Sequence, residues 1–349
     1  MAKQVYDEND QMVMDTMQEY SEDMDSVTPQ DVKNLCVTGF PADVFDDVLL
    51  QNKNKVPVAS QTPEDLEKYI EDHSKEVPKL NISGTLLEEA KVTQRFDSAH
   101  RSCLEAVFSL MNAGNTCATS AMIFRTMTGG PRGMRVTKAQ KKLVDDLMSS
   151  MLYSPVRIEM PIVGPDGEVE KTITLESPMI AADKMIMKMS GALCVAYRFK
   201  SSYFYDYCRR TNALIKTPYD MLFVPKLQKT ERNISLISFV QRKLANYLYP
   251  TDKEYVKPSP LTVDIEEAYH AVYPGTDKIS YTEKNRIRSN IEVILDTLKE
   301  NGYIVKWHFV QNAASVKAVR ILFPDTVPPV DDFGGSRQDL CAKLFAGSG

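Results

Sequence analysis

"RVTKAQKKLVDDLMSSMLYSPVRIEM" (residues 135–160) contains a basic helix start and the strand that follows the helix. Its first eight residues hold four cations and no acid, and apolar residues then recur at helical spacing from Leu143 to Met151. After Pro155 the period changes to two, because charged and apolar residues alternate. The stretch therefore predicts an amphipathic helix with a basic exposed face, followed directly by a β-strand.

Two shorter helices are predicted before this stretch, and a returning strand after it. "DSAHRSCLEAVFSLMNAGN" (97–115) has an apolar helical face and ends at Gly114, a natural C-cap. "TCATSAMIFRTMTGG" (116–130) is a second short helix that ends at a glycine pair. "GPDG" (164–167) makes a turn, and "EVEKTITL" (168–175) alternates as the second strand of a hairpin. The order is helix, helix, helix, hairpin.

The same order of elements recurs about 145 residues later, without residue-level identity. Three helical patterns are followed by two alternating segments, and these are "NISLISFVQRKLANYLY" (233–249), "TVDIEEAYHAVYPG" (262–275), "YTEKNRIRSNIEVILDTLKENG" (281–302), "YIVKWHFV" (303–310) and "SVKAVRILF" (315–323). Between the two units, "ALCVAYRF" (192–199) is predicted to be a strand and the residues after it a helical connector.

Three helices followed by a β-hairpin are typical of a winged helix-turn-helix, in which the third helix can lie in the DNA major groove and the hairpin is the wing. We therefore predict an α+β, mainly helical fold with two tandem winged helix-turn-helix units and β-hairpin wings, preceded by an acidic, partly helical N-terminal extension. The predicted divisions are an extension (1–95), a first winged-helix domain (96–197), a helical connector (198–232), a second winged-helix domain (233–324) and a C-terminal tail (325–349).

The N-terminal extension carries most of the acidic charge. Residues 1–90 hold 20 Asp and Glu against 7 Lys and Arg, whereas the rest of the chain has a net charge of +8. Residues 1–27 are predicted to be loose, and "TPQDVKNLC" (28–36) and "TPEDLEKYIEDH" (62–73) each to start a helix. The asymmetry favours a body that binds a polyanion; chance clustering on solvated faces is the alternative.

Composition excludes several classes of protein. The chain of 349 residues is 43% apolar and 26% charged, as in soluble globular proteins. No apolar run is long enough for a transmembrane helix, and the first residues lack the apolar core of a secretory signal. Six scattered cysteines form no CxxC pair, which is typical of reduced thiols. We expect a cytoplasmic protein that does not bind membranes.

The third helix of each unit must dock through its apolar face and offer cations to phosphates and long polar side chains to base edges. Gln140 is expected to contact a base edge, and Asn285 and Asn290 are expected to contact adenine. Asp145 and Asp146 are expected on the exposed face, where the first of these helices leaves the groove. An ordinary solvated helix face is the alternative. The residues expected to contact DNA are Arg132, Arg135, Lys138, Gln140, Lys141, Lys142 and Lys171 in the first unit, and Lys284, Asn285, Arg286, Arg288, Asn290, Gln311, Asn312 and Lys317 in the second.

The connector is basic and rich in aromatic residues. Ten cations lie between Arg198 and Lys243, and four aromatic residues lie among them: Tyr203, Phe204, Tyr205 and Tyr207. These rings either stack on bases of a single strand or pack the two units together, and we favour packing between the units.

No catalytic pattern is visible in the sequence. The four histidines (His73, His100, His270 and His308) stand far apart, without an HxH or HExxH motif, and no GxxxxGK[ST] loop exists. "TGGPRGMR" (128–135) is glycine-rich but lacks the lysine of a phosphate loop, so a flexible turn is predicted there. We expect no catalytic residues, no metal, no cofactor and no enzymatic activity.

Parts of the chain resemble the tandem winged-helix replication initiators of plasmids, including those of Gram-positive plasmids and phages. The resemblance covers about residues 96–324 and rests on "HRSCLEAVFSLMNAGN", "TKAQKKLVDDLMSSMLYSPVRIE" and "YFYDYCRRTNALIKTPYDMLFVPKLQKTERNISLISFVQRKLANYL". It implies binding to repeated sites at an origin, with host replication proteins opening the duplex.

The function expected from these patterns is sequence-specific binding of double-stranded DNA by a protein of a plasmid, phage or mobile element. It acts as a replication initiator-like protein or as a winged-helix regulator, and homodimer formation is an accompanying expectation. The alternative is a phage or mobile-element inhibitor that keeps a winged-helix scaffold and uses its acidic segment to bind a host or defence protein.

Overall fold

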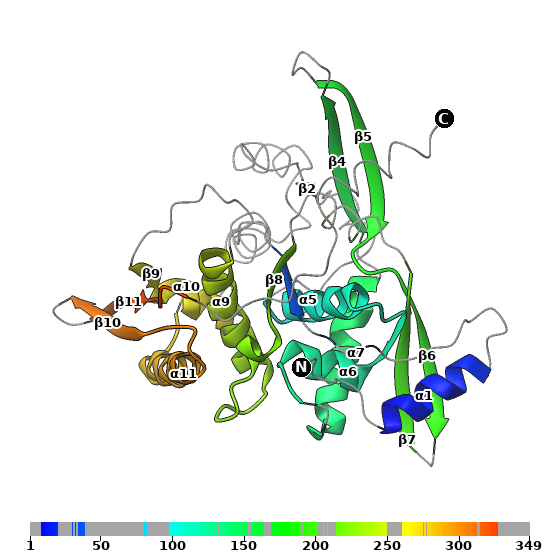
Figure 1. The fold of residues 1–349 in the computed structure, drawn as a ribbon, viewed down its shortest axis with the longest axis horizontal. Helices are drawn as coiled ribbons and strands as arrows, with labels where there is room; N and C mark the ends of the chain where they lie inside the picture. The colour runs from blue at the N-terminus through cyan, green and yellow to red at the C-terminus, as the bar shows by residue number, and fades with distance from the viewer. Residues whose placement is uncertain are drawn as a thin grey trace.

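The computed structural model describes the chain in segments: residues 8–19, 30, 32, 34–38, 80–81, 98–131, 133–152, 155–163, 169–189, 192–200, 205, 208, 214–249, 260–274, 276, 278–312 and 315–326. The fold is mixed α/β, and helices pack against small antiparallel sheets (Figure 1). In the part described, no helix combines the length and the apolar character needed to cross a membrane.

The first group of elements centres on three helices and a three-stranded sheet. Two strands, β6 and β7, form a hairpin, and β7 also pairs with the short strand β3 that precedes the second helix. The three helices expected from the sequence are confirmed. In chain order the elements are α5 (Ser98–Asn112), β3 (Cys117–Thr119), α6 (Ser120–Met127), α7 (Lys138–Leu152), β6 (Ala182–Met189) and β7 (Ala192–Phe199).

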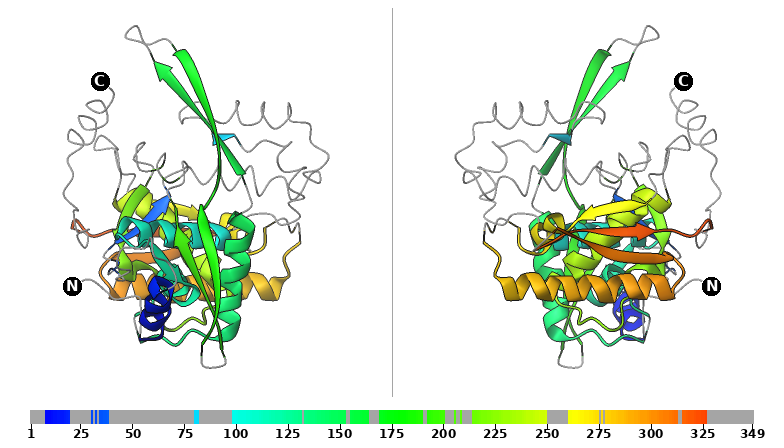
Figure 2. Two further views of the ribbon diagram at one scale, coloured as in Figure 1. Left: turned by 90° about the vertical axis from the view of Figure 1, so that its right-hand side faces the viewer. Right: turned by 90° about the vertical axis from the view of Figure 1, so that its left-hand side faces the viewer.

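The hairpin expected as the first wing exists, but it occupies a different place. It consists of β4 (Pro155–Val163) and β5 (Val169–Pro178), and it pairs with β2 (Leu80–Asn81) instead of β3. In Figures 1 and 2 it rises clear of the helices. Lys171, a predicted wing contact, therefore lies on β5, outside the sheet that packs on α7. Alternation identifies a hairpin, but its partner strand depends on distant residues.

The second group of elements repeats this arrangement with a single hairpin. The strand β11 pairs with β10 on one side and with β9, which precedes the second helix, on the other. The helices and the hairpin expected from the sequence are confirmed, whereas the four residues of β9 were not predicted as a strand. The elements are α9 (Glu231–Leu248), β9 (Leu261–Asp264), α10 (Ile265–Val272), α11 (Tyr281–Glu300), β10 (Lys306–Asn312) and β11 (Ser315–Leu322).

Side-chain caps explain where the helices of the second group begin. Asp264 accepts a hydrogen bond from the backbone N–H of Glu266 at the start of α10. Ser280 and Glu283 form a capping box at the start of α11, because the serine hydroxyl accepts from the Glu283 backbone N–H. The helix ends before Gly302, whose φ of 80° few other residues adopt.

The acidic N-terminal region contributes to the folded body, which corrects two predictions. Residues Glu8–Glu19 form the helix α1 instead of a loose segment, with Val13 and Met14 buried. Asp10 of α1 makes a buried ion pair with Arg125 of α6. The local pattern missed α1 because its apolar residues are few and its anchor is an ion pair with a distant helix.

The segment "TPQDVKNLC" was expected to start a helix, but Asn34–Thr38 form the strand β1. Its partner is the antiparallel strand β8 (Leu214–Pro218), inside the connector predicted to be helical. Both predictions are wrong for these residues, because pairing between distant segments overrides local propensity. The predicted helix at 62–73 lies outside the described residues, and so does most of the tail.

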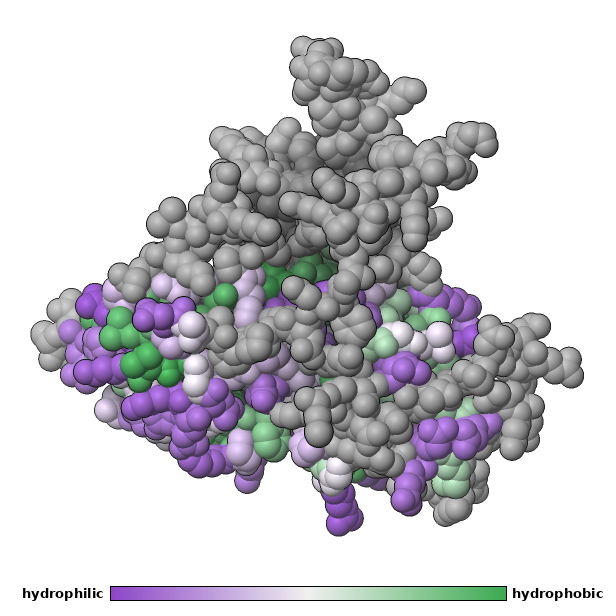
Figure 3. All heavy atoms as spheres, viewed as in Figure 1, coloured by the Kyte–Doolittle hydropathy of each residue, from purple (hydrophilic) through white to green (hydrophobic). Residues whose placement is uncertain are grey.

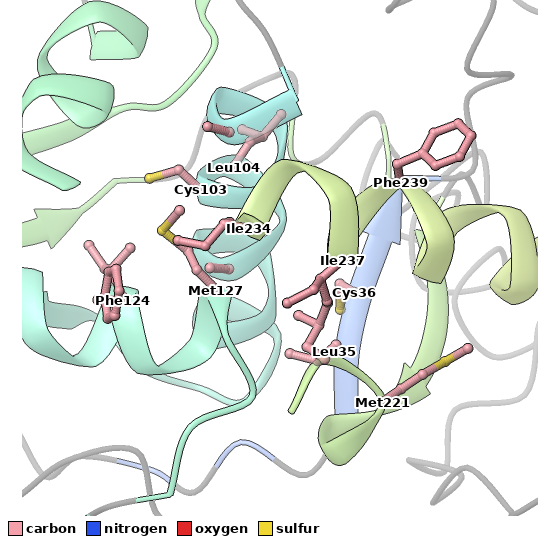
Figure 4. Packing of buried hydrophobic residues seen from close by; sticks show 14 of the residues in the cluster. Leu35, Cys36, Cys103, Leu104, Phe124, Met127, Met221, Ile234, Ile237 and Phe239 are labelled. Atoms are coloured by element: carbon pink, nitrogen blue, oxygen red, sulfur yellow. The ribbon is translucent and has the colours of Figure 1, made fainter. Parts of the chain in front are cut away.

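The two groups of elements share a continuous hydrophobic core. Leu35 on β1, Leu104 on α5 and both Ile234 and Ile237 on α9 belong to one cluster of buried residues (Figure 4). The domain boundaries at residues 95, 197, 232 and 324 stay predictions. The shared core joins the two groups where α5 packs against α9.

A buried charged cluster accompanies the apolar contacts between α5 and α9. Glu105 Oε1 lies 3.4 Å from Arg101 Nε on its own helix, and Glu105 Oε2 lies 3.9 Å from Arg242 Nη1 on α9. Arg242 also donates hydrogen bonds to the hydroxyls of Ser238, at 2.8 Å, and Ser98, at 3.4 Å. Arg242, counted above among the basic connector residues, is thus an internal anchor and not a surface cation.

Candidate nucleic-acid interface

The helix α7 begins with a capping box that the sequence contains in the form Thr-x-x-Gln. The backbone N–H of Gln140 donates to the Thr137 hydroxyl at 3.3 Å, and the Thr137 N–H donates to Gln140 Oε1 at 2.9 Å. No acidic residue lies in the first turn. Gln140, predicted to read a base edge, therefore already has its side-chain oxygen committed to starting the helix.

The loop that leads into α7 is anchored from two sides. The Tyr219 hydroxyl donates to the carbonyl oxygens of Arg125, at 3.1 Å, and Gly130, at 2.9 Å. Arg125 Nε in turn donates to the Met134 carbonyl at 3.1 Å. Gly129 has a φ of 60°, and a Cβ there would lie 2.8 Å from the Tyr219 carbonyl oxygen. The glycine-rich stretch thus fixes the direction in which α7 leaves α6, instead of acting as a flexible turn.

The predicted cations of the first unit surround the N-terminal half of α7. Arg135, Lys138 and Lys142 are exposed and Lys141 is half-buried, while the opposite face of the helix buries Val144, Leu147, Met148 and Met151. Lys142 pairs with Asp146 at 3.1 Å, and both side chains are more than half exposed. Such surface pairs contribute at most about 1 kcal/mol, so the lysine readily exchanges its carboxylate for a phosphate. Arg132 lies outside the described residues.

Asp145 was expected on the exposed face of α7, but the structure places it against the sheet. Its carboxylate accepts hydrogen bonds from the hydroxyl of Ser120 on α6 and, at 3.1 Å, from the hydroxyl of Tyr197 on β7. Burial and the neighbouring Asp145 raise the pKa of Tyr197, which keeps this tyrosine a hydrogen-bond donor. The expectation was wrong because Asp145, three residues from buried Met148, lies at the edge of the buried face.

In the second unit, Tyr269 of α10 holds two of the predicted cations. Arg288 Nε donates to the Tyr269 hydroxyl at 2.6 Å, and Lys284 Nζ lies 5.0 Å from the centre of its ring. Lys284 also pairs with Glu266 at 3.4 Å, and Asn285 accepts a hydrogen bond from Arg288 at 3.3 Å. Burial raises the pKa of Tyr269 while Arg288 lowers it. The cations are therefore held in defined positions.

Tyr273, one turn further along, is contacted by three charged residues. Its hydroxyl accepts from Arg286 Nη2 at 2.6 Å and from Arg232 Nη1 at 3.0 Å, and donates to Glu283 Oε1 at 2.7 Å. Arg232 also stacks over the tyrosine ring, 4.6 Å from its centre. The hydrogen bonds from Tyr273 and Ser280 lower the pKa of the Glu283 carboxyl.

The remaining predicted contacts are less uniform. Asn290, expected to read adenine, donates to Asn233 Oδ1 at 2.9 Å and so joins α11 to α9. Gln311 and Lys317 are exposed on the β10–β11 hairpin, where the register shifts between Val310 and Gln311. Asn312 and Lys171 lie on strands, but their side chains fall outside the described part of the structure. The face seen in Figure 3 is mostly hydrophilic over the region of α11, and it shows a hydrophobic patch over the region of the β10–β11 hairpin.

Arg232, Tyr269, Tyr273 and Glu283 were not predicted as site residues. Tyr269 on α10 and Tyr273 at its C-cap are four residues apart, a spacing that places them on one side of the helix. Their role depends on how α11 and α9 approach α10, which the local sequence does not contain. Of the connector aromatics, Tyr205 packs against the first unit, because its ring lies 5.0 Å from that of Phe108 on α5. That these aromatics pack the two units together stays a prediction.

Other kinds of site are not formed by the described residues. In that part of the chain, no group of three or more His, Cys, Asp and Glu side chains is arranged to hold a metal ion. Cys103 and Cys208 are free thiols, and burial raises the pKa of both, so they stay uncharged.

Comparisons with known proteins leave the class of the protein open. The chain matches no protein-family model and no curated protein sequence. Among solved structures, it is similar to the crystal structure of selenomethionine derivatives of domain 2 and domain 3 of RctB, with 10% sequence identity and a TM-score of 0.32. The match covers 65% of this chain and 83% of that one. A similarity of this size carries no argument about fold or function.

Proposed function

We propose that this chain is a sequence-specific double-stranded DNA-binding protein built from two winged helix-turn-helix units. The observation that carries the proposal is topological. In both groups of elements the short strand before the second helix pairs with the hairpin after the third helix, as β3 does with β7 and β9 with β11. That connection is typical of winged helices.

The N-terminal half of α7 is the major-groove element of the first unit in this proposal. Arg135, Lys138 and Lys142 are exposed there without an acid in the first turn, so phosphates on both sides of a groove meet cations. The β6–β7 hairpin is the wing, and Lys184 at its base donates to Ser149 of α7 at 3.2 Å. This contact holds the hairpin and the helix in one orientation.

The second unit offers α11 and the β10–β11 hairpin in the same roles. Because α5 and α9 share a core and a buried charged cluster, the two units bind DNA as one body, without the cost of ordering a linker. An extended or repeated site suits such a protein, as at a replication origin or an operator. We propose a binding role without catalysis, so host proteins would open the duplex.

Fluorescence anisotropy with labelled duplex DNA across a salt series tests the proposal. Several phosphate contacts give an affinity that falls steeply with salt, with a slope of about −0.9 per neutralised phosphate. A triple variant with Lys138→Glu, Lys141→Glu and Lys142→Glu is expected to bind far more weakly and with a shallower slope.

The matched control changes three exposed lysines by the same total charge, outside α7, the start of α11 and both proposed wings: Lys200→Glu, Lys226→Glu and Lys299→Glu. It is expected to retain most of the affinity. Equal losses in both triple variants would mean that only net charge matters. An absence of duplex binding by the wild-type chain at low salt would refute the proposed function.

A further inference from the structure

We infer that Arg232, Tyr273 and Arg286 form a binding site for one phosphate group, and that the phosphate is one from the DNA backbone. The inference rests on the proposed function, because it identifies a DNA phosphate that the second unit binds at the edge of the major groove. The three residues come from three elements: the first turn of α9, the residue after α10, and the second turn of α11.

The geometry brings two guanidinium groups to a single point. Arg232 Nη1 and Arg286 Nη2 donate to the same Tyr273 oxygen, at 3.0 and 2.6 Å, so the two groups are neighbours although they belong to different helices. Each guanidinium carries five N–H donors, and these contacts use one of each. Both arginines are exposed to solvent. A tetrahedral phosphate beside the hydroxyl has enough oxygens to accept from both forks at once.

Tyr273 positions the two arginines because its own hydrogen is committed elsewhere. The hydroxyl donates to Glu283 Oε1 at 2.7 Å, which leaves the oxygen lone pairs for the guanidinium groups. The other oxygen of Glu283 accepts from the Ser280 hydroxyl at 3.0 Å. Glu283 thus orients the Tyr273 hydroxyl through one carboxylate oxygen and binds the helix-capping Ser280 through the other. Arg232 is further restrained by its stacking on the tyrosine ring.

The local charge favours an anion. Four cations and two carboxylates lie at this corner of the unit, so positive charge is in excess there. The carboxylates are those of Glu266 and Glu283, and the cations are Arg232, Lys284, Arg286 and Arg288. The corner also lies at the N-terminal end of α11, the helix proposed to enter the groove. A phosphate bound here flanks the bases that α11 faces and fixes the register of the unit.

The test compares Arg232→Gln, Arg286→Gln and the double variant with Lys299→Gln, an exposed lysine in the last turn of α11, at the opposite end of that helix from the site. The salt slope of duplex binding is measured for each. Loss of one phosphate contact flattens the slope by about 0.9. Each single variant is expected to show most of that change and the double variant no more than about 0.9, because both arginines serve one phosphate. Lys299→Gln is expected to keep the wild-type slope.

A second variant separates positioning from charge. Tyr273→Phe keeps the ring under Arg232 and both positive charges but removes the oxygen on which the arginines converge. It is expected to weaken DNA binding severalfold while the salt slope stays near the wild-type value. Thermal unfolding of every variant checks that the second unit remains folded.

A measurement without DNA keeps the inference separable from the proposed function. The full chain is titrated with inorganic phosphate and followed through the arginine Nε–H resonances. The resonances of Arg232 and Arg286 are expected to shift together, and that of Arg320, an exposed arginine on β11, to stay unchanged. If the wild-type chain binds DNA and the arginine variants bind it with the same salt slope, the phosphate site is overturned but the proposed function is not. Additive slope losses of about 1.8 in the double variant mean two separate phosphates, and also overturn it. Failure of both resonances to respond to phosphate overturns it whether or not DNA binds.

Discussion

Removal of the Glu105 carboxylate is expected to destabilise the whole chain, because this group lies between two buried arginines. Its side chain is 7% exposed, and those of Arg101 and Arg242 are 2% and 5% exposed. Glu105→Ala removes the carboxylate that both arginines contact where α5 meets α9. The substitution changes none of the predicted DNA contacts on α7 and α11.

The expected magnitude follows from the distances. At an effective dielectric constant of about 20, charges separated by 3.4 or 3.9 Å attract by about 4–5 kcal/mol per pair before desolvation and the repulsion between the arginines are counted. Removing one partner of a buried pair typically costs about 3–5 kcal/mol, because the other charge stays buried. Retained hydrogen bonds from Arg242 to Ser98 and Ser238 place the expected loss near the lower end, at about 3 kcal/mol.

Urea unfolding followed by circular dichroism measures the loss through the transition midpoint and slope. Asp146→Ala is a matched control, because it also breaks an i,i+4 ion pair, between residues that are 76% and 59% exposed. That change is expected to cost less than about 1 kcal/mol. Glu105→Gln keeps the size of the side chain and removes the charge, so it separates the electrostatic loss from the cavity. A Glu105→Gln variant as stable as the wild type would refute the reasoning.

Three further predictions concern other parts of the fold. Gln140→Ala is expected to lower the free energy of unfolding by about 1 kcal/mol, measured in urea, and Gln140→Glu to restore it, since either side chain completes the capping box at Thr137. Val319→Ile is expected to raise the free energy of unfolding by about 0.8 kcal/mol, the value of one buried methylene, because it fills a cavity of about 20 Å³ in the core of the second unit. A lower free energy of unfolding would show that the cavity cannot accept the added methylene. Burial lowers the pKa of Lys229 from 10.5 to about 8, so the unfolded chain binds more protons between these values and stability rises with pH there. Lys229→Met should show a smaller rise between pH 8 and 10, in urea titrations at several pH values.

The sequence was sufficient where periodicity extends over many residues. The buried faces repeat at helical spacing over about two turns in α7 and about three turns in α11, so both helices were predicted close to their observed bounds. The strands β3 and β9, of three and four residues, are too short to show a period. The sequence therefore gives no sign of their pairing with β7 and β11, on which the proposed winged-helix units depend.

Contacts between distant segments account for the other errors. The strand β1 pairs with a strand 176 residues or more away, as the register Thr38 to Leu214 shows, and each partner alone fits a different prediction. On a helical projection, Asp145 and Gln140 look like exposed polar residues. However, Asp145 accepts a hydrogen bond from Ser120 and lies against the sheet, and Gln140 uses its side-chain oxygen to cap the helix instead of contacting a base. Residue type and spacing do not identify such partners.

The two units hold their cations differently, and this difference assigns them different parts in the proposed binding. The exposed lysines of α7 form at most a surface ion pair, so they supply affinity that salt screens and that tolerates small changes in position. Tyr269 and Tyr273 hold the cations of α11 in place, so less side-chain entropy is lost when a phosphate binds there. Because α5 and α9 are joined through a buried charged cluster, the register set at α11 also determines where α7 meets the duplex. A single well-positioned phosphate in the second unit would therefore align both units on one site.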